Sequence, residues 1–308
     1  MRIVLAGGSG FLGSRLRARF ATTGTEVVSL VRRAPTGPDQ VRWWPDKGEL
    51  APTALAGADA VINLAGAPVG PRRWTNGYKA LLVRSRVQTT GTLARVIAAL
   101  PAEKRPGVLL NASGVGFYGD TGDTAVDESA PAGDRFLSEL CKLWEAATEP
   151  AADAGVRVVL LRTGLPLHAS DGLLKPLLIP FRLGAGAKLG SGRQWWPWIS
   201  VTDWEDAVRF LIDRADLGGA VNVTGPHPDT NAEFTRVLAE LLHRPALLTV
   251  PSPVFRAALG GFADESLISQ RVLPGVLSNA GFAFRHPTLR EALRAALDLD
   301  RPADLPHV

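Results

Sequence analysis

Residues 3–13 read Ile-Val-Leu-Ala-Gly-Gly-Ser-Gly-Phe-Leu-Gly, and this stretch decides the fold class. Four small or apolar residues, typical of a buried strand, run directly into a glycine-rich turn. An arginine-rich amphipathic segment follows and predicts a helix. A strand, a glycine-rich turn and a helix in this order form an anion-binding corner, because the first turn of a helix offers unpaired N–H groups.

The spacing of the glycines gives each one a separate task. Gly7 permits the tight turn, Gly10 lets a diphosphate approach the backbone, and Gly13 allows the helix to pack closely on the strand. The motif therefore predicts a dinucleotide site. Its expected cofactor contacts are Gly7, Ser9, Gly10, Phe11, Leu12 and Gly13.

The end of the second expected strand indicates which dinucleotide binds. An acidic residue there would accept a hydrogen bond from a ribose 2′-hydroxyl, whereas an arginine would pair with a 2′-phosphate. The strand at 26–31 ends in Arg32 and Arg33, with no carboxylate at that point. We therefore predict NADP(H) as the cofactor; the alternative is that both arginines belong to a solvated loop of an arginine-rich chain.

The first 165 residues alternate strand-like and helical segments, as in a parallel sheet with helices on both faces. We predict an α/β fold, a Rossmann-like doubly wound parallel sheet, over residues 1–165. The expected strands are 2–6, 26–31, 41–44, 59–63, 107–112 and 156–162, and the expected helices are 11–23, 76–99 and 134–153.

The alternation loosens after residue 165, where proline, glycine and tryptophan become frequent. This change predicts a smaller C-terminal, substrate-side lobe over 166–308, some segments of which return to the main sheet. The expected strand at 220–224 is one such segment. Helices are expected at 203–214, 231–243, 253–260 and 289–297.

Composition excludes several classes of protein. The 308 residues are 46% hydrophobic and 21% charged, with a net charge of +4. No apolar run approaches the ~18 residues of a membrane span, and no basic stripe indicates nucleic-acid binding. Cys141 is the lone cysteine, which excludes an intrachain disulfide and favours a cytoplasmic setting. The histidines lack metal-ligand spacing, so we expect no metal site; they are His168, His227, His243, His286 and His307.

Several further motifs follow one another in a recognisable order. They include Arg73-Trp74-Thr75, Ser113-Gly114-Val115-Gly116-Phe117-Tyr118-Gly119, Cys141-x-x-Trp144-Glu145, Leu161-Arg162-Thr163-Gly164 and Gly190-Ser191-Gly192-Arg193-Gln194-Trp195. Over nearly the whole chain, the sequence resembles an atypical, epimerase-like branch of the short-chain dehydrogenase/reductase superfamily. Its members are described as nucleotide-sugar epimerases and carry a C-terminal domain of unknown function from about residue 250. Relatives usually have histidine at the position of Ser200, and Gly-Gly at the position of Asp171-Gly172.

The resemblance implies further cofactor contacts. Small residues after the fourth strand would let the cofactor lie against the backbone, although an ordinary turn would look the same. Further contacts are implied for two residues of the long helix, although these could instead lie on a solvated helix face. A serine at the end of the fifth strand and a residue after the sixth complete the set. The positions are Asn63, Leu64, Ala65, Gly66, Ser85, Arg86, Ser113 and Leu165.

The usual catalytic pair of the superfamily, Tyr-x-x-x-Lys, is absent. The chain has only Tyr78 and Tyr118, and neither is followed by lysine four residues on. Leu137 and Cys141 stand where the tyrosine and lysine would be. The standard route for the proton is therefore missing.

Ser113 and Tyr118 are the remaining candidates for proton transfer. Ser113 resembles the serine that binds a substrate oxygen, and Tyr118 could act as an acid from the following loop. Each could instead be structural: a strand-end turn residue and a packed loop tyrosine. Lys142 and Glu145, three residues apart, are interpreted as a helix-surface ion pair.

A cluster of aromatic residues with one arginine suits a ring beside a phosphate or carboxylate. The predicted substrate contacts are Arg193, Trp195 and Trp198, although the tryptophans could equally form the core of the lobe. The leading hypothesis is an oxidoreductase or epimerase-like enzyme that moves a hydride to or from a small polar substrate, as a monomer or homodimer. The alternative is a non-catalytic NADP(H)-binding sensor or scaffold.

Overall fold

The computed structural model describes residues 1–70 and 73–299, and its centre is a seven-stranded parallel sheet. The strand order is β13-β7-β5-β4-β1-β2-β3, so the direction of winding reverses at β1. This is the predicted doubly wound Rossmann-like arrangement. The strands are β1 (Arg2–Ala6), β2 (Glu26–Val31), β3 (Gln40–Arg42), β4 (Ala60–Asn63), β5 (Val108–Gly114), β7 (Arg157–Thr163) and β13 (Gly219–Val223).

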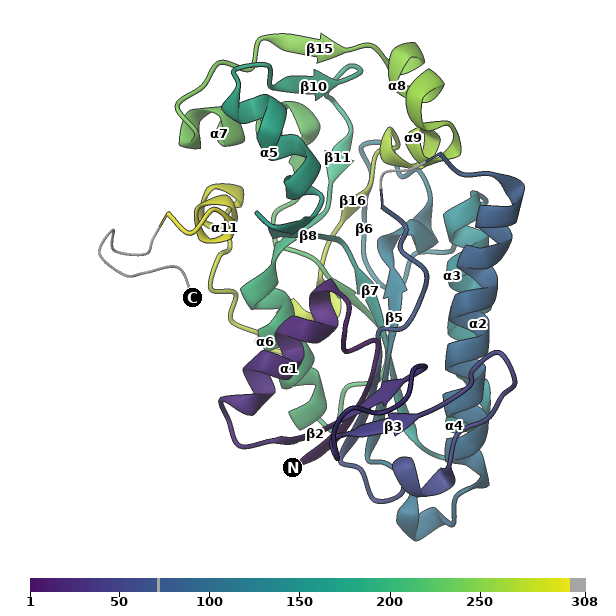
Figure 1. Ribbon diagram of the computed structural model, residues 1–308. Helices are drawn as coiled ribbons and strands as arrows, with labels where there is room; N and C mark the ends of the chain where they lie inside the picture. The colour runs from purple at the N-terminus through teal and green to yellow at the C-terminus, as the bar shows by residue number, and fades with distance from the viewer. Residues whose placement is uncertain (71–72, 300–308) are drawn as a thin grey trace.

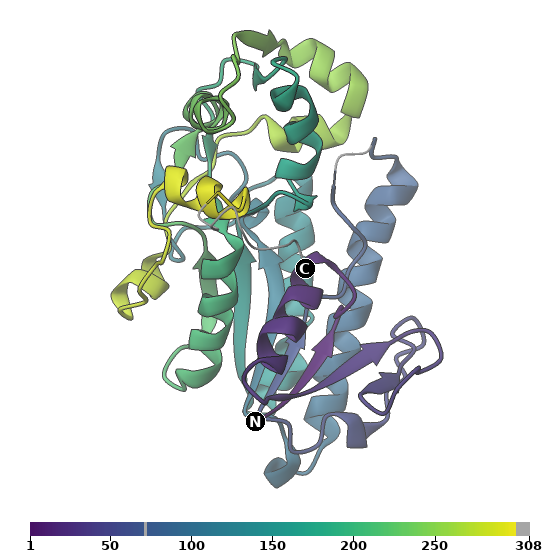
Figure 2. The same cartoon turned by 60° about the vertical axis from the view of Figure 1, so that its left-hand side comes forward.

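Helices cover both faces of this sheet (Figures 1 and 2). One face packs against α1 (Phe11–Ala21), α6 (Val201–Asp213) and the short α10 (Gly275–Asn279). The other packs against α2 (Asn76–Ala99) and α4 (Glu149–Asp153), and α3 (Phe136–Ala146) continues that layer beside α2. The strands are apolar on both faces because both faces are covered, as parallel sheets require.

The helix expected over 134–153 is two helices, and this part of the prediction is wrong. The helix α3 ends at Ala146, and the hydroxyl of Thr148 donates to the carbonyl of Glu145 at 2.7 Å. Pro150 then stands in the first turn of α4. A side chain that binds the last turn, followed by a proline without an N–H, divides the helix.

The second half of the chain returns to the main sheet, as predicted. Residues of β13 pair with β7 in parallel register, from Gly219 opposite Val159 to Val223 opposite Thr163. Apart from α6 and α10, which cover the sheet, the rest of this half forms a smaller lobe over the carboxyl ends of the strands, with its own apolar core (Figure 1). Its helices are α5 (Leu174–Arg182), α7 (Asn231–Leu241), α8 (Ser252–Leu259), α9 (Gly261–Ser266) and α11 (Leu289–Ala296).

Short strands connect the lobe internally and to the loops of the first half. Three of them pair as β12-β8-β9, and three two-stranded pairs are β10-β15, β11-β14 and β16-β6. Their bounds are β6 (Ala125–Val126), β8 (Leu165–His168), β9 (Asp171–Gly172), β10 (Ala187–Leu189), β11 (Trp195–Trp196), β12 (Trp198–Ser200), β14 (Asp229–Thr230), β15 (Leu248–Val250) and β16 (Arg271–Val272). Single-turn helices lie at η1 (Pro52–Ala54), η2 (Ala102–Lys104) and η3 (Val115–Tyr118).

The described residues lack two features that the composition led us not to expect. Among residues 1–70 and 73–299, none of the helices is both long and apolar enough to cross a membrane. The same residues contain no group of three or more histidine, cysteine or acidic side chains placed to hold a metal ion. His307 lies outside the described residues, as does the end of the predicted lobe, 300–308.

Candidate functional site

Two glycines of the first turn are required by the protein itself. Gly7 has φ +83°, and a Cβ there would lie 2.7 Å from the carbonyl carbon of Leu64. A Cβ on Gly13 would lie 2.2 Å from the carbonyl oxygen of Gly7. Neither position has room for a side chain, so the fold of the turn depends on both.

Gly10 is different because the protein does not fill the space beside it. A Cβ there would meet only the carbonyl oxygen of Gly7, at 3.4 Å, and Ser9 and Gly10 are both exposed. Gly10 is the N-cap of α1 but makes no side-chain cap, and the first turn of the helix contains no acidic residue. A diphosphate would fit here, because there is space beside Gly10, the backbone N–H groups of the first turn are free, and the positive end of the helix dipole lies at this point.

Arg32 lies at the carboxyl end of β2 beside this turn and is exposed. Within the described part of the chain it makes no ion pair or side-chain hydrogen bond, whereas Arg33 donates to the hydroxyl of Thr36 at 3.2 Å. The two predicted arginines therefore differ. The guanidinium of Arg32 is unengaged, which suits the 2′-phosphate contact predicted for it.

Hydrogen bonds to two side chains, Asn63 and Ser85, fix the loop after β4. Asn63 is fully buried; its amide nitrogen donates to Thr90 at 2.9 Å and to Asn111 at 2.7 Å, and its oxygen accepts from the backbone of Ala65. The hydroxyl of Ser85 accepts from the backbone of Ala67 at 3.0 Å. Asn63 and Ser85 thus fix the shape of the loop, and the backbone of residues 64–66 is what borders Gly7.

Ser113, at the carboxyl end of β5, is the centre of a buried polar cluster. Its hydroxyl donates to Oε1 of Glu145 on α3 at 2.6 Å. Arg162 on β7 grips the same carboxylate with two hydrogen bonds of 2.9 Å, one from Nε to Oε1 and one from Nη2 to Oε2. Both charged side chains are about nine-tenths buried, and each balances the charge of the other.

Tyr118 closes the other side of this cluster. Nη1 of Arg162 donates to the Tyr118 hydroxyl at 3.0 Å, and that hydroxyl donates to Oδ1 of Asn222 at 2.7 Å. The guanidinium also lies 3.4 Å from the ring centroid of Phe117. Burial raises the pKa of Tyr118, against the opposing effect of Arg162. With its hydroxyl engaged on both sides, Tyr118 is placed to hold Arg162, and its proton-transfer role stays a prediction.

The two positions that replace the usual tyrosine and lysine are filled by apolar packing. The side chain of Leu137 packs against Gly116, and the thiol of Cys141 donates to the carbonyl of Gly114 at 3.6 Å. Burial, together with the charge of Glu145, raises the pKa of the Cys141 thiol to about 11. Cys141 is therefore a neutral thiol at physiological pH and not a nucleophile.

The interpretation of Lys142 and Glu145 as an ion pair is wrong. Lys142 pairs with Glu139 on the exposed face of α3, while Glu145 points inward to Arg162. The sequence does contain a signal for the true partner, because Arg162 lies in a strand buried between two others. A charge in such a position requires an opposite charge beside it.

The predicted substrate contacts lie in different surroundings. Trp198 is 1% exposed within the lobe core, and its indole donates to Asp229 at 2.9 Å, which favours the core alternative for this residue. Trp195 is half-buried, with its indole bonded to Asp123 and the guanidinium of Arg271 over its ring. Arg193 is exposed, and its backbone N–H donates to Ser191.

Leu165 opens β8 directly above the end of β7. Its N–H donates to the carbonyl of Pro197 at 2.8 Å, and it pairs in register with Trp198. Phe11 and Leu12 begin α1; Phe11 lies against the ring of His168, and Leu12 packs on the sheet core. These contacts bring the lobe strand β8 close to the glycine-rich turn.

A family model now accounts for most of these features at once. The model of the NAD dependent epimerase/dehydratase family matches residues 3–225, which contain the turn, the sheet and the Ser113 cluster. The chain belongs to this epimerase/dehydratase family. Residues 250–296 match a second model, the domain of unknown function DUF1731, which agrees with the C-terminal domain implied by the resemblance.

Individual members of the epimerase/dehydratase family are similar over nearly the full chain. Epimerase family protein Mb2239 of Mycobacterium bovis is 46% identical over 292 residues, which are 94% of this chain and 96% of that protein. The crystal structure of human epimerase family protein SDR39U1 (isoform 2) with NADPH superposes with a TM-score of 0.89, at 33% identity, over 97% of this chain and 99% of that one.

A third member of the family extends further than this chain. The structure of a nucleoside-diphosphate sugar epimerase from Corynebacterium glutamicum superposes with a TM-score of 0.82 at 33% identity. The match covers 99% of this chain but 59% of that one. The shared part is therefore the whole of the fold described above.

Ser200 occupies the position at which the resemblance implies a histidine. Its hydroxyl caps α6 by accepting from the N–H of Asp203 at 3.0 Å, and it lies 2.9 Å from Nδ1 of His286. The carboxylate of Asp203 also accepts from the backbone of Arg285 and His286. An imidazole thus reaches this position from the C-terminal segment.

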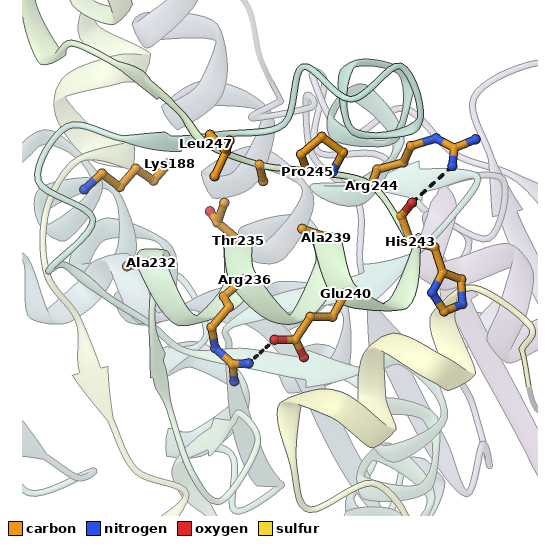
Figure 3. A pocket seen from close by; sticks show the side chains of 11 residues that line it. Lys188, Ala232, Thr235, Arg236, Ala239, Glu240, His243, Arg244, Pro245 and Leu247 are labelled. Carbon is orange, nitrogen blue, oxygen red and sulfur yellow. Dashed lines mark hydrogen bonds and ion pairs between the residues drawn. The ribbon is translucent and has the colours of Figure 1, made fainter.

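A hollow lies elsewhere in this epimerase/dehydratase fold, on the outer surface of the lobe. It has a volume of about 650 Å³ and is bordered by α7, the start of β10 and the segment 243–247 (Figure 3). Its walls include the ion pair of Arg236 with Glu240. None of the predicted site residues lines it, so it is separate from the Ser113 cluster.

Proposed function

We propose that this protein is an NADP(H)-dependent oxidoreductase or epimerase-like enzyme that acts on a small polar alcohol or carbonyl compound. The observation that carries the proposal is the 2.6 Å hydrogen bond between Ser113 and the buried carboxylate of Glu145, at the sheet edge that holds the glycine-rich turn. Support for NADP(H) comes from the open space at Gly10, the unengaged Arg32, and the NADPH in the human relative's crystal structure.

Three groups of residues would hold the cofactor. The N-terminus of α1 and Gly10 receive the diphosphate, Arg32 receives the 2′-phosphate, and the backbone of 64–66 borders the ribose. When bound, NADP(H) supplies or accepts the hydride.

Ser113 and Glu145 would transfer the proton of the substrate hydroxyl. The single proton of the Ser113 hydroxyl is committed to Glu145, so the serine oxygen can accept a hydrogen bond from a substrate hydroxyl. In the oxidation direction, the substrate O–H proton passes to the Ser113 oxygen as the serine proton passes to Oε1 of Glu145. The carboxylate ends protonated, the serine is restored and the substrate oxygen becomes a carbonyl; the reduction direction reverses each transfer.

Arg162 and Tyr118 act as positioning residues in this scheme. The bidentate guanidinium fixes the plane of the Glu145 carboxylate and aims Oε1 at Ser113. Tyr118 and Asn222 in turn fix the guanidinium. The Ser113–Glu145 pair thus takes over the proton transfer that Tyr-x-x-x-Lys performs in ordinary members of the superfamily.

The test is turnover of NADPH, followed by its absorbance, with a panel of aldehydes, ketones and keto-sugars. Ser113→Ala and Glu145→Gln are each expected to abolish turnover while NADPH still binds. Tyr118→Phe is expected to retain turnover, with kcat reduced more than KM is changed. Turnover that survives the double variant Ser113→Ala, Tyr118→Phe would contradict this assignment of roles.

A second candidate, a non-catalytic NADP(H)-binding sensor or scaffold, is favoured by one observation. Every polar side chain of the Ser113 cluster already has a partner within the protein, as in a purely structural network. A purified preparation that holds NADPH tightly, and whose NADPH no carbonyl compound oxidises, would support this alternative over the enzyme.

We propose a small-molecule partner and a cytoplasmic location for the protein. The partner is a small molecule and not a nucleic acid, and the protein acts as a monomer or homodimer. A cytoplasmic location rests on the lone cysteine, Cys141, which suits a reducing compartment.

A further inference from the structure

Arg86, on α2, is a buried positive charge without a negative partner. It is 7% exposed, and Nη1 donates to the carbonyls of Ala67 at 3.0 Å and Leu82 at 3.1 Å. Nε is buried and has no hydrogen-bond partner among residues 1–70 and 73–299. Over the same ranges, no carboxylate is among the groups that act on its charge. A buried charge in such a state is costly, and native proteins retain one where it has a use.

The other charges nearby do not compensate for Arg86. Arg162 and Glu145 neutralise each other, while Cys141 and Tyr118 are uncharged at neutral pH. Burial lowers the pKa of Arg86 to about 10, which leaves the guanidinium charged at that pH. The ring of Trp144, 4.8 Å from the guanidinium, stabilises the cation from one side without cancelling its charge. The buried centre therefore carries one net positive charge.

The contacts of Arg86 place this charge between the two halves of the site. On one side, a Cβ on Gly66 would lie 3.2 Å from Cζ of Arg86, and the same loop reaches Gly7 through Leu64. On the other side, the guanidinium lies against the ring of Trp144 on α3, the helix that also carries Cys141. The Cys141 thiol in turn contacts the carbonyl of Gly114, the residue after Ser113.

We propose that Arg86 is the buried receptor for an oxyanion, a phosphate or carboxylate group of the bound ligand, that enters between Gly66 and Ser113. The inference rests on the proposed function, since it assigns a charge preference to that site. The oxyanion has two sources, the diphosphate of the dinucleotide or an acidic group of the substrate. Either would supply the negative charge that the described residues do not.

The experiment compares Arg86→Gln and Arg86→Lys with the wild type and with Arg84→Gln, a matched control on the exposed face of the same helix. Calorimetry measures the dissociation constants of NADPH and of adenosine 2′-phosphate, which lacks the diphosphate. It also measures inorganic phosphate binding to the NADPH complex. A charged hydrogen bond predicts a loss of about 10- to 100-fold in the affected affinity.

These binding measurements distinguish the two possible sources of the oxyanion. If Arg86→Gln weakens NADPH but not adenosine 2′-phosphate, the oxyanion is the diphosphate. If NADPH binding is unchanged but phosphate no longer binds to the complex, the oxyanion belongs to the substrate. Arg86→Lys is expected to recover part of the lost affinity. Unchanged affinities in every arm would overturn the inference and leave the proposed function standing.

Stability distinguishes a receptor from a structural arginine. Removal of an uncompensated charge in Arg86→Met is expected to leave the free protein's unfolding midpoint unchanged or higher, and to abolish the rise in midpoint caused by the ligand. A destabilised or unfolded Arg86→Met protein would show that the guanidinium supports the chain, and would overturn the inference. If the wild type binds no NADPH, the proposed function fails, and phosphate binding to the free protein then decides the role of Arg86.

Discussion

The glycine-rich turn and the Ser113 cluster lie at the same edge of the sheet but are built in opposite ways. Around Gly10 and Arg32 the protein leaves space and unpaired donors. Around Ser113 each hydroxyl, carboxylate and guanidinium has a partner at hydrogen-bond distance. The turn is completed by its ligand, whereas the cluster is complete before any ligand arrives.

The difference shows how the two regions are stabilised. The turn uses backbone groups, which cost no side-chain entropy to hold and tolerate an empty state in water. The cluster holds charges away from water, which is tolerable only when every charge is matched. Mutations of the unfilled positions at the turn, Gly10 and Arg32, should therefore affect binding, whereas mutations in the cluster should affect stability.

The largest expected effect is on the cluster. Glu145→Ala leaves the buried Arg162 without its carboxylate and is expected to lower the free energy of unfolding by about 3–5 kcal/mol. Chemical denaturation measures it. Glu139→Ala, which removes the exposed pair with Lys142 on the same helix, is the control and should cost about 0.5 kcal/mol or less. Equal losses for the two variants would show that the cluster is not preorganised.

Substitution of two glycines in the same turn should have opposite consequences, one for stability and one for NADPH binding. Gly13→Ala forces a Cβ against the Gly7 carbonyl and should lower the free energy of unfolding by about 1–3 kcal/mol or more. Gly10→Ala fills only open space, so stability should change by less than about 1 kcal/mol. NADPH affinity, measured by calorimetry, should nevertheless fall at least about 10-fold in Gly10→Ala. A destabilised Gly10→Ala protein with normal NADPH affinity would reverse the assignment.

Substitution of Arg32 tests whether this side chain binds the 2′-phosphate of the cofactor. Arg32→Ala removes an unengaged guanidinium, so stability should not change, while NADPH affinity should fall about 10- to 100-fold. NADH affinity should remain within about two-fold of the wild-type value. Arg33→Ala is the control, because Arg33 already bonds Thr36. Equal losses of NADPH and NADH affinity would remove Arg32 from the 2′-phosphate site.

The smallest expected effect is a pH dependence at the cluster. The folded protein raises the pKa of Cys141 from 9.0 to about 11, so the stability due to the neutral thiol is fully present below pH 9.0 and is lost as the pH rises through 11. By about pH 10 the loss should be about 1 kcal/mol. Unfolding curves of the wild type and Cys141→Ala should diverge in slope over this range. Parallel curves would show that the thiol is not buried.

Local patterns predicted the sheet and the turn well. The strands expected at 2–6 and 26–31 and the helix expected at 76–99 have the predicted bounds, because each is set by its own periodicity and by adjacent turn residues. The space beside Gly10 follows from the same local motif. These features need no knowledge of distant contacts.

The Ser113 cluster could be predicted only in part. Ser113 was identified from its position at a strand end, but its partners Glu145 and Arg162 lie on α3 and β7, and only the folded sheet brings them together. A spacing of three residues suggested Lys142 as the partner of Glu145, although burial favours Arg162. For Trp198 the sequence leaves a ligand contact and the lobe core as equal alternatives, and its burial favours the core, because local sequence does not tell which side of a loop is covered.

The pairing of β13 with β7 has a consequence for how such a protein can change. The chain leaves the main sheet after β7, builds one part of the lobe, returns to supply the outermost strand, and then builds the rest of the lobe. A cut at residue 165 would strip that strand away and leave the backbone of β7 open to other molecules. Evolution and engineering alike must therefore remodel the lobe by altering loops within it, since it cannot be exchanged as a detachable module.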